Sequence, residues 1–119
     1  MKIAVIDDND LHLQLIAYLL KKENFEVYIF RSAIEGLNWL KDNKAEIILL
    51  DLQLPIMNGI EVLNEIKRDE RHNGVKIIAI TAQQKFEGKT FLELGFDGHI
   101  IKPINSKNFT EEVRKIAKI

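Results

Sequence analysis

Short apolar runs of strand length recur along the chain and alternate with longer amphipathic stretches. The runs cover residues 3–6, 27–30, 46–50, 75–80 and 99–101. Such alternation is typical of βαβ units, in which parallel strands form a sheet with helices on both faces. Because runs 46–50 and 77–80 are almost continuously apolar, we expect these strands to be buried on both sides. The sequence thus predicts an α/β fold with a doubly wound, five-stranded parallel sheet flanked by five helices.

The amphipathic stretches show helical periodicity and recognisable ends. We expect the first helix to run from about residue 10 to residue 22, with Asn9 or Asp10 as its N-cap. Ser32 has a glutamate three residues later, which is a capping-box signature for the second helix, and Ser106 is expected to open the last one. The positions expected to pack inward are Ile16, Leu19, Leu20, Ala33, Leu37, Trp39, Leu40, Ile56, Met57, Val62, Leu63, Ile66, Phe91, Leu92, Leu94, Phe109, Val113 and Ile116.

Length and composition exclude several classes of protein. The 119 residues fit one domain, and 17 Lys and Arg against 18 Asp and Glu provide no basic field for nucleic acid. The absence of cysteine excludes disulfides and thiolate metal sites. No apolar run approaches the roughly 20 residues of a membrane span, and a strand pattern beginning at residue 2 leaves no room for a signal peptide. We therefore expect a cytoplasmic domain with no membrane anchor.

Polar residues of distinct chemistry follow four of the apolar runs. The first run ends on Asp7 and Asp8, the third on Asp51, the fourth on Thr81 and the fifth on Lys102. The carboxyl ends of parallel strands share one edge of a sheet, and ligands bind in the crevice there. We therefore expect these five side chains to converge at one site.

Three carboxylates in one crevice repel one another unless a positive charge lies between them. A site with oxygen ligands, few protein groups and room for water favours Mg²⁺ over Ca²⁺. Aspartate is also common in turns and at helix caps, so a structural role is the alternative for Asp7, Asp8 and Asp51. The shared position of all three favours a metal site.

Lys102 precedes a proline, which favours an extended backbone that directs its ammonium group into the crevice. There it could pair with a carboxylate or an incoming anion, and the Thr81 hydroxyl could donate to an anionic oxygen. A metal, an ammonium and a hydroxyl around one carboxylate are the groups that phosphoryl transfer needs, because that chemistry depends on positioning and charge neutralisation. Asp51 is the candidate nucleophile, since a carboxylate is already ionised at neutral pH.

Five motifs occur in order along the chain. They are Val5-Ile6-Asp7-Asp8-Asn9, Leu49-Leu50-Asp51-Leu52-Gln53-Leu54-Pro55 with Gly59, Ile80-Thr81-Ala82, Gly95-Phe96-Asp97-Gly98 and Ile101-Lys102-Pro103. In this order and spacing they resemble the receiver domains of two-component response regulators, which have a CheY-like, flavodoxin-like fold. The resemblance covers residues 1–119 and implies a single, stand-alone receiver domain with no output domain.

The resemblance implies that Asp51 takes a phosphoryl group from a phosphohistidine of a histidine kinase or a histidine phosphotransfer protein. Asp8, Asp51 and the backbone carbonyl of Gln53 would bind Mg²⁺ directly, while Asp7 would act largely through water. Such a protein catalyses only its own phosphorylation and dephosphorylation and is not counted as an enzyme. We expect a monomer that passes the phosphoryl group on or signals to a downstream effector protein.

The resemblance also assigns phosphoryl-oxygen contacts to Thr81 and Lys102, and a cis peptide bond between Lys102 and the following proline. His99 occupies the switch position three residues before the lysine, where the family often has tyrosine or phenylalanine. Its imidazole could titrate near neutral pH. The stretch from Thr81 to Gly95 is about one residue shorter than the commonest family pattern, so its helix, which Gly95 is expected to end, is the least defined.

A docking surface for a partner protein is expected beside the crevice. His12 and Leu15 lie off the inward face of the first helix, and Pro103 with Ile104 would extend the same apolar patch. Neither His12 nor His72 is expected to lie in the core.

Two other functions compete with this interpretation. A small Mg²⁺-dependent phosphatase of the haloacid dehalogenase type would also use Asp51 as nucleophile, but it needs an acid two residues later, where Gln53 stands. A flavodoxin-like electron carrier needs a Ser/Thr/Gly-rich phosphate loop after the first strand, which the sequence lacks.

Overall fold

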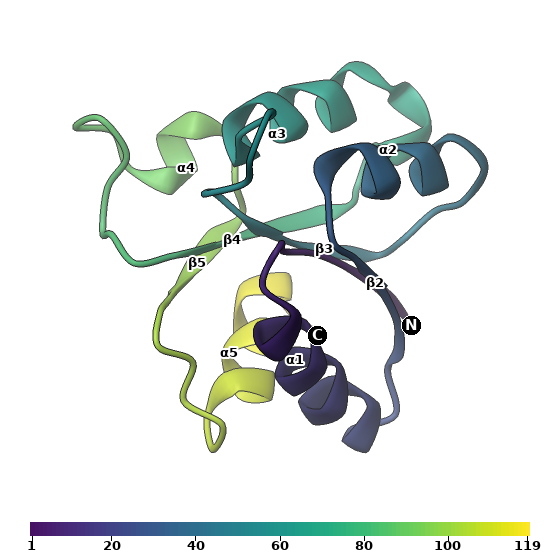
Figure 1. Cartoon of the computed structure of the whole chain (residues 1–119), viewed down its shortest axis with the longest axis vertical. Helices are drawn as coiled ribbons and strands as arrows, with labels where there is room; N and C mark the ends of the chain where they lie inside the picture. The colour runs from purple at the N-terminus through teal and green to yellow at the C-terminus, as the bar shows by residue number, and fades with distance from the viewer.

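The computed structural model describes residues 1–119. Five strands form one parallel sheet in the order β2-β1-β3-β4-β5, as Figure 1 shows. The strands are β1 (Lys2–Ile6), β2 (Glu26–Phe30), β3 (Ile47–Asp51), β4 (Lys76–Thr81) and β5 (Gly98–Ile101). The expected doubly wound, five-stranded parallel sheet is therefore confirmed.

The helices form two layers, one on each face of the sheet. Helices α1 (Asp10–Lys22) and α5 (Phe109–Ala117) cover one face, whereas α2 (Ala33–Asp42), α3 (Gly59–Arg68) and the short α4 (Phe91–Leu94) cover the other (Figure 1). A 3-10 turn, η1 (Glu70–His72), follows α3. None of these helices has the length and apolar character needed to span a bilayer.

Alternate residues of the strands pack into two separate cores. In β1, Ala4 and Ile6 pack with α2 and α3, whereas Ile3 and Val5 pack with α1 and α5. All five residues of β3 are buried, because this strand lies between β1 and β4 and has helices on both faces. Each large apolar side chain that is fully buried contributes about 1.5–3 kcal/mol. The packing holds the end of β3 in a fixed position.

The expected N-caps of the first two helices are found, but the expected capping box at Ser32 is only half formed. The Asn9 side chain accepts a hydrogen bond from the backbone N–H three residues later at 3.2 Å, so Asn9 rather than Asp10 caps α1. The Ser32 hydroxyl accepts from Glu35 N at 3.1 Å. The Glu35 carboxylate accepts from the backbone N–H before Ser32, so the reciprocal half of the expected box is displaced by one residue.

Ser106 does not open the last helix, which begins at Phe109. Asn105 forms the preceding turn instead: its side chain accepts from Lys107 N at 3.0 Å, and its carbonyl accepts from Phe109 N at 3.0 Å. An asparagine side chain bonds readily to the backbone two residues on. This turn delays the start of the helix beyond the position that Ser106 suggested.

The segment after β4 contains a hairpin turn followed by a single turn of helix. Phe86 and Lys89 donate backbone hydrogen bonds to each other at 2.9 Å across residues 87–88, both of which have positive φ. Positive φ at both central positions is typical of a type I′ turn and ends helical geometry. Helix α4 begins only after Thr90 and ends at Gly95, whose φ is +110°. The expected C-cap at Gly95 is confirmed.

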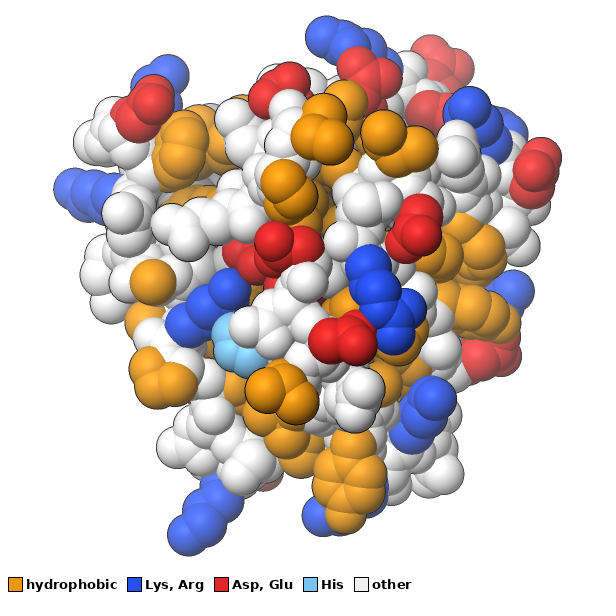
Figure 2. All heavy atoms as spheres, viewed as in Figure 1, with side chains coloured by type: hydrophobic (Ala, Val, Ile, Leu, Met, Phe, Trp, Pro, Cys, Tyr) orange, Lys and Arg blue, Asp and Glu red, His pale blue; other side chains and the backbone are white.

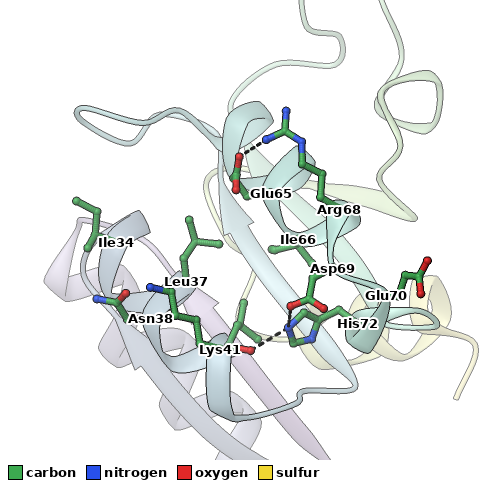
Figure 3. A pocket seen from close by; sticks show the side chains of 11 residues that line it. Ile34, Leu37, Asn38, Lys41, Glu65, Ile66, Arg68, Asp69, Glu70 and His72 are labelled. Carbon is green, nitrogen blue, oxygen red and sulfur yellow. Dashed lines mark hydrogen bonds and ion pairs between the residues drawn. The ribbon is translucent and has the colours of Figure 1, made fainter.

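Three side chains lie elsewhere than the sequence suggested: His72, Ile56 and Leu92, which was expected to pack inward but is 70% exposed on the single turn of α4. His72, which was not expected in the core, is 7% exposed, and its Nε2 lies 2.9 Å from the Leu40 carbonyl oxygen and 3.7 Å from Asp69 Oδ2 (Figure 3). Because a carbonyl only accepts hydrogen bonds, Nε2 carries the proton, and the ring joins the end of α2 to η1. Ile56 was expected to pack inward but is 94% exposed, whereas Met57 and Trp39 do pack against the core.

Candidate functional site

The three carboxylates predicted to share a crevice do meet at the carboxyl ends of β1 and β3. Ligand atoms of Asp7, Asp8 and Asp51 lie within 4.8 Å of one another. Figure 2 shows acidic side chains gathered near the middle of this face, with hydrophobic side chains around them. The structure therefore brings together groups from the first and the central strand, as the strand pattern predicted.

Asp51 is held on both sides of its carboxylate. Oδ1 accepts a hydrogen bond from Gln53 N at 3.0 Å, and Oδ2 lies 3.1 Å from Lys102 Nζ. The residue is only 3% exposed, so the ion pair with Lys102 is poorly screened by water. The ammonium group therefore lies directly against the candidate nucleophile.

Asp7 is the most buried of the three acids, at 1% exposed. Its Oδ1 accepts from Asn9 N at 2.8 Å, whereas Oδ2 has no hydrogen-bond partner and lies 3.4 Å from His12 Nδ1. Burial raises the pKa of Asp7 above its ordinary value, and repulsion from Asp51 raises it further, despite the opposing hydrogen bond from Asn9. An uncompensated buried carboxylate oxygen beside a second carboxylate is a position that a cation would stabilise.

Asp8 differs from its neighbours in being exposed to solvent. The cluster thus offers buried carboxylate oxygens from Asp7 and Asp51 and an accessible one from Asp8, with no nitrogen or sulfur ligand among the three acids. Such an all-oxygen donor set, open to water on one side, suits a hard divalent ion and fits Mg²⁺. Gln53 adjoins the cluster through its N–H bond to Asp51.

Thr81 and Lys102 complete the crevice from β4 and the end of β5. Lys102 N donates to the Thr81 carbonyl at 2.8 Å, which fixes the two residues side by side. The Thr81 hydroxyl oxygen is buried and accepts from Gln83 N at 3.1 Å, so its proton is available for a different acceptor. The peptide bond between Lys102 and Pro103 is cis, as expected.

Gly59 allows the helix after the loop to approach the end of β3 closely. A Cβ atom on this residue would lie 2.8 Å from Leu52 Cα and 2.9 Å from the Asp51 carbonyl oxygen, closer than real Cβ atoms come. Gly59 N also donates to the Leu52 carbonyl at 3.1 Å. Only glycine fits this contact without a shift of the backbone that carries Asp51.

His99 lies on β5, the strand that pairs with β4, which carries Thr81. The residue is partly buried. Its ring packs against Phe91 with centroids 4.8 Å apart, and its Nε2 lies 3.5 Å from Gln84 Oε1. The side chain is thus held by α4 and by the segment before it. These contacts connect His99, the expected switch residue, to the segment between Thr81 and Gly95, whose structure the sequence predicted least well.

The expected docking residues differ in exposure. Leu15 and Pro103 are exposed, whereas Ile104 is half-buried against the core beneath α1 and α5. His12 is half-buried beside Asp7 rather than fully on the surface. Sequence reasoning missed this contact, because Asp7 lies before the start of α1 and its spacing from His12 gives no helical signal.

The largest pocket lies away from the acids. It has a volume of about 680 Å³ and lies between α2, which contributes Leu37 and Asn38, and the segment of α3 and η1 that carries Ile66, Asp69 and His72 (Figure 3). None of the strand-end residues lines it. Charge, burial and geometry therefore locate the chemistry at the acidic crevice rather than at the largest hollow.

Sequence comparison identifies similar proteins. The family model described as the response regulator receiver domain matches residues 3–114. A curated relative, the polar-differentiation response regulator DivK of Brucella ovis, is 30% identical over 113 residues, which are 94% of this chain and 92% of the relative.

Solved structures of similar proteins share the fold. The chemotaxis response regulator CheY4 of Vibrio cholerae has a TM-score of 0.90 at 21% identity, with 97% of each chain covered. The CheY-like receiver domain protein of Methanospirillum hungatei JF-1 has a TM-score of 0.85 at 30% identity, covering 98% of this chain and 93% of that one. The receiver domain of the sensor histidine kinase PA1611 from Pseudomonas aeruginosa, with a TM-score of 0.86 at 22% identity, covers 99% of this chain and 98% of that one and has a magnesium ion coordinated in its active-site cleft. The CheY-like, flavodoxin-like fold is confirmed.

Proposed function

We propose that Asp51 is the phosphoryl acceptor of this chain, which belongs to the response regulator receiver family. The chain is a receiver domain of the CheY-like type, and the competing phosphatase interpretation is not favoured. The observation that carries the assignment to Asp51 is its environment. Lys102 Nζ lies 3.1 Å from one carboxylate oxygen, and two further acids lie within 4.8 Å.

The acidic cluster is the proposed Mg²⁺ site. Asp8, Asp51 and the backbone carbonyl of Gln53 would hold the ion, with Asp7 acting largely through water. Bound there, Mg²⁺ would neutralise the carboxylates and draw an anionic phosphoryl group toward Asp51. The buried Asp7 Oδ2, which accepts no hydrogen bond, supports this proposal, because a nearby cation would offset the cost of burying it.

In the transfer, an Asp51 carboxylate oxygen forms a bond to phosphorus while the phosphorus–nitrogen bond of a phosphohistidine breaks. The electron pair of that bond returns to the imidazole nitrogen of the donor. Lys102 and the Thr81 hydroxyl hold the phosphoryl oxygens, and Lys102 exchanges its present partner, the carboxylate, for the new phosphoryl anion. Because the chain modifies only itself, we do not class it as an enzyme.

The donor is a histidine kinase or a histidine phosphotransfer protein, and the output is a downstream effector protein or the next phosphoryl acceptor. His12, Leu15, Pro103 and Ile104 form the proposed docking surface. His12 lies beside Asp7 and Pro103 follows Lys102, which supports this role, and Leu15 and Pro103 are exposed. We propose that the chain acts as a monomer.

The switch proposal links Thr81 to His99. Movement of the Thr81 hydroxyl toward a phosphoryl oxygen would open space behind it, and the His99 ring would change rotamer by leaving Phe91, which it contacts at 4.8 Å. We expect Thr81→Ala to remain phosphorylatable but to lose the coupled movement of His99. Imidazole resonances of His99 that do not change upon phosphorylation of the unaltered chain would contradict the switch.

Incubation with phosphoramidate and Mg²⁺ tests the acceptor directly. Intact-mass measurement should show one added phosphoryl group on the unaltered chain and none on Asp51→Asn. Circular dichroism provides the control, because the isosteric amide should leave the fold intact. Full labelling of Asp51→Asn would exclude this residue as the acceptor.

A further inference from the structure

Ile56 is the most exposed large hydrophobic residue of the structure, and its backbone is unusual. It is 94% exposed and has a φ of +69°. Met57 N donates to the Pro55 carbonyl at 2.7 Å, which closes a three-residue turn around it. A turn of this kind with positive φ is rare and strained, and a β-branched residue is poorly suited to it. Glycine or asparagine would adopt this conformation at lower cost.

The fold provides no contact that would offset this strain. With 94% of its surface exposed, Ile56 gains almost nothing from the core. A strained, solvent-exposed apolar side chain beside a functional site points to a contact made outside the chain. Other exposed hydrophobic residues, such as Leu11 and Leu92, lie in helices and carry no such backbone penalty.

The loop that carries Ile56 is tied closely to Asp51. Leu52 N donates to the Ile80 carbonyl at 3.3 Å, and Gly59 N donates to the Leu52 carbonyl at 3.1 Å, so both ends of the loop are anchored at the end of β3. Ile56 is three residues from Gly59, which limits their separation to about 11 Å. Figure 1 shows this loop leaving the carboxyl end of β3, the edge where the acids lie.

A protein that delivers a phosphoryl group to Asp51 must cover this loop. A protein interface of standard size covers about 800 Å² on each partner, which corresponds to a patch of about 16 Å radius. A patch of this size, centred on the crevice, includes Ile56, because Ile56 lies so close to Gly59. A small phosphodonor makes no comparable contact.

We propose that Ile56 is an apolar anchor for the phosphohistidine-bearing donor protein, which presents an apolar hollow beside its phosphohistidine. The inference rests on the proposed function of Asp51 and adds the residue through which a protein donor is recognised. Burial of an isoleucine that is 94% exposed in the free chain makes a large contribution to affinity. The strained turn holds the side chain outward before the partner arrives, which lowers the ordering cost of binding.

Two substitutions at this position test the proposal, because stability and transfer should change in opposite directions. Ile56→Asn and Ile56→Gly remove the anchor and relieve the backbone strain. Ile56→Asn should raise the melting temperature by about 3–6 °C. Labelling of Asp51 by phosphoramidate should be unchanged in both variants. Transfer from a phosphorylated histidine kinase at subsaturating concentration should fall at least about tenfold. The kinase used is the one from the same genome that phosphorylates the unaltered chain fastest.

Lys118→Asn is the matched control, because Lys118 also has a positive φ, of 61°, but follows α5 at the opposite edge of the sheet. This variant should gain stability and retain both labelling rates. Kinase transfer to Ile56→Asn at the unaltered rate would overturn the proposal, as would an equal loss of phosphoramidate labelling. Failure of the unaltered chain to be labelled by phosphoramidate would instead contradict the assignment of Asp51.

Discussion

Gly59→Ala is expected to disturb the acceptor aspartate through the backbone. The added methyl group would lie 2.7 Å from Leu52 Cδ2, 2.8 Å from Leu52 Cα and 2.9 Å from the Asp51 carbonyl oxygen. The Leu52 side chain can rotate away, but the other two atoms belong to the backbone at the end of β3. Relief of the clash therefore requires α3 and the end of β3 to separate.

The magnitude follows from two opposing contributions. Insertion of a methyl group into a close-packed contact costs about 1–3 kcal/mol. Alanine is favoured over glycine inside a helix by up to about 1 kcal/mol, but Gly59 is the first residue of α3, where that gain is incomplete. The expected net loss is about 1–2 kcal/mol. Because Asp51 shifts with the backbone, its phosphorylation by phosphoramidate should also slow.

Gly36→Ala is the matched control. Its Cβ would lie 2.5 Å from Ile6 Cδ1 and 2.8 Å from Ile6 Cγ1, which are atoms of a side chain that can adjust. Gly36 is also inside α2, where alanine gains its helix propensity, so the net loss of stability should be smaller than for Gly59→Ala. Urea unfolding and phosphoramidate labelling should separate the two variants. Equal stability and equal labelling rates for Gly59→Ala and the unaltered chain would refute the close-contact argument.

The remaining predictions concern the metal, the docking surface and acid stability. Asp8→Ala should weaken Mg²⁺ binding, measured by calorimetry. The melting temperature of the metal-free variant should stay level or rise, because one of three repelling acids is removed. A clear fall in that melting temperature would instead indicate that Asp8 is a structural cap. Leu15→Glu should slow transfer from a kinase but not from phosphoramidate, whereas equal loss of both rates would assign Leu15 to the fold. Hydrogen bonds from Arg71 lower the pKa of Asp69 to about 2, so this pair stabilises the fold above the unfolded pKa near 4 and loses its effect as the pH falls toward 2. Arg71→Gln should therefore reduce the pH dependence of unfolding in that window, and an unchanged acid-unfolding curve would contradict the role of the pair.

The sheet and the crevice could be predicted because local pattern determines both. The apolar runs are strands whose period and length identify them, and parallel strands bring their carboxyl ends together regardless of loop detail. Asp7, Asp51 and Lys102 therefore meet because each lies at the carboxyl end of a strand or directly after it. Glycine spacing also identified the end of α4 at Gly95.

Features that depend on distant partners could not be predicted in this way. His72 looks like a surface residue in a polar segment, and its burial depends on the Leu40 carbonyl, 32 residues away in sequence. The exposure of Ile56 follows from the fold of its loop rather than from its hydrophobicity. The positive φ values of residues 87–88 do have a local signal, since glycine in a two-residue turn indicates a hairpin.

The strand order has a consequence for how the domain assembles during synthesis. β1 pairs with β2 and then receives β3 on its other side, after which β4 and β5 add outward in sequence order. A nascent chain can therefore extend the sheet strand by strand from the N-terminus, without displacing a pair already formed. The three acids come together once β3 has docked, whereas Lys102 arrives only after the last strand. The half-built domain thus carries a concentrated negative charge that Lys102 offsets in part, so we expect electrostatic attraction to add to apolar burial when β5 docks.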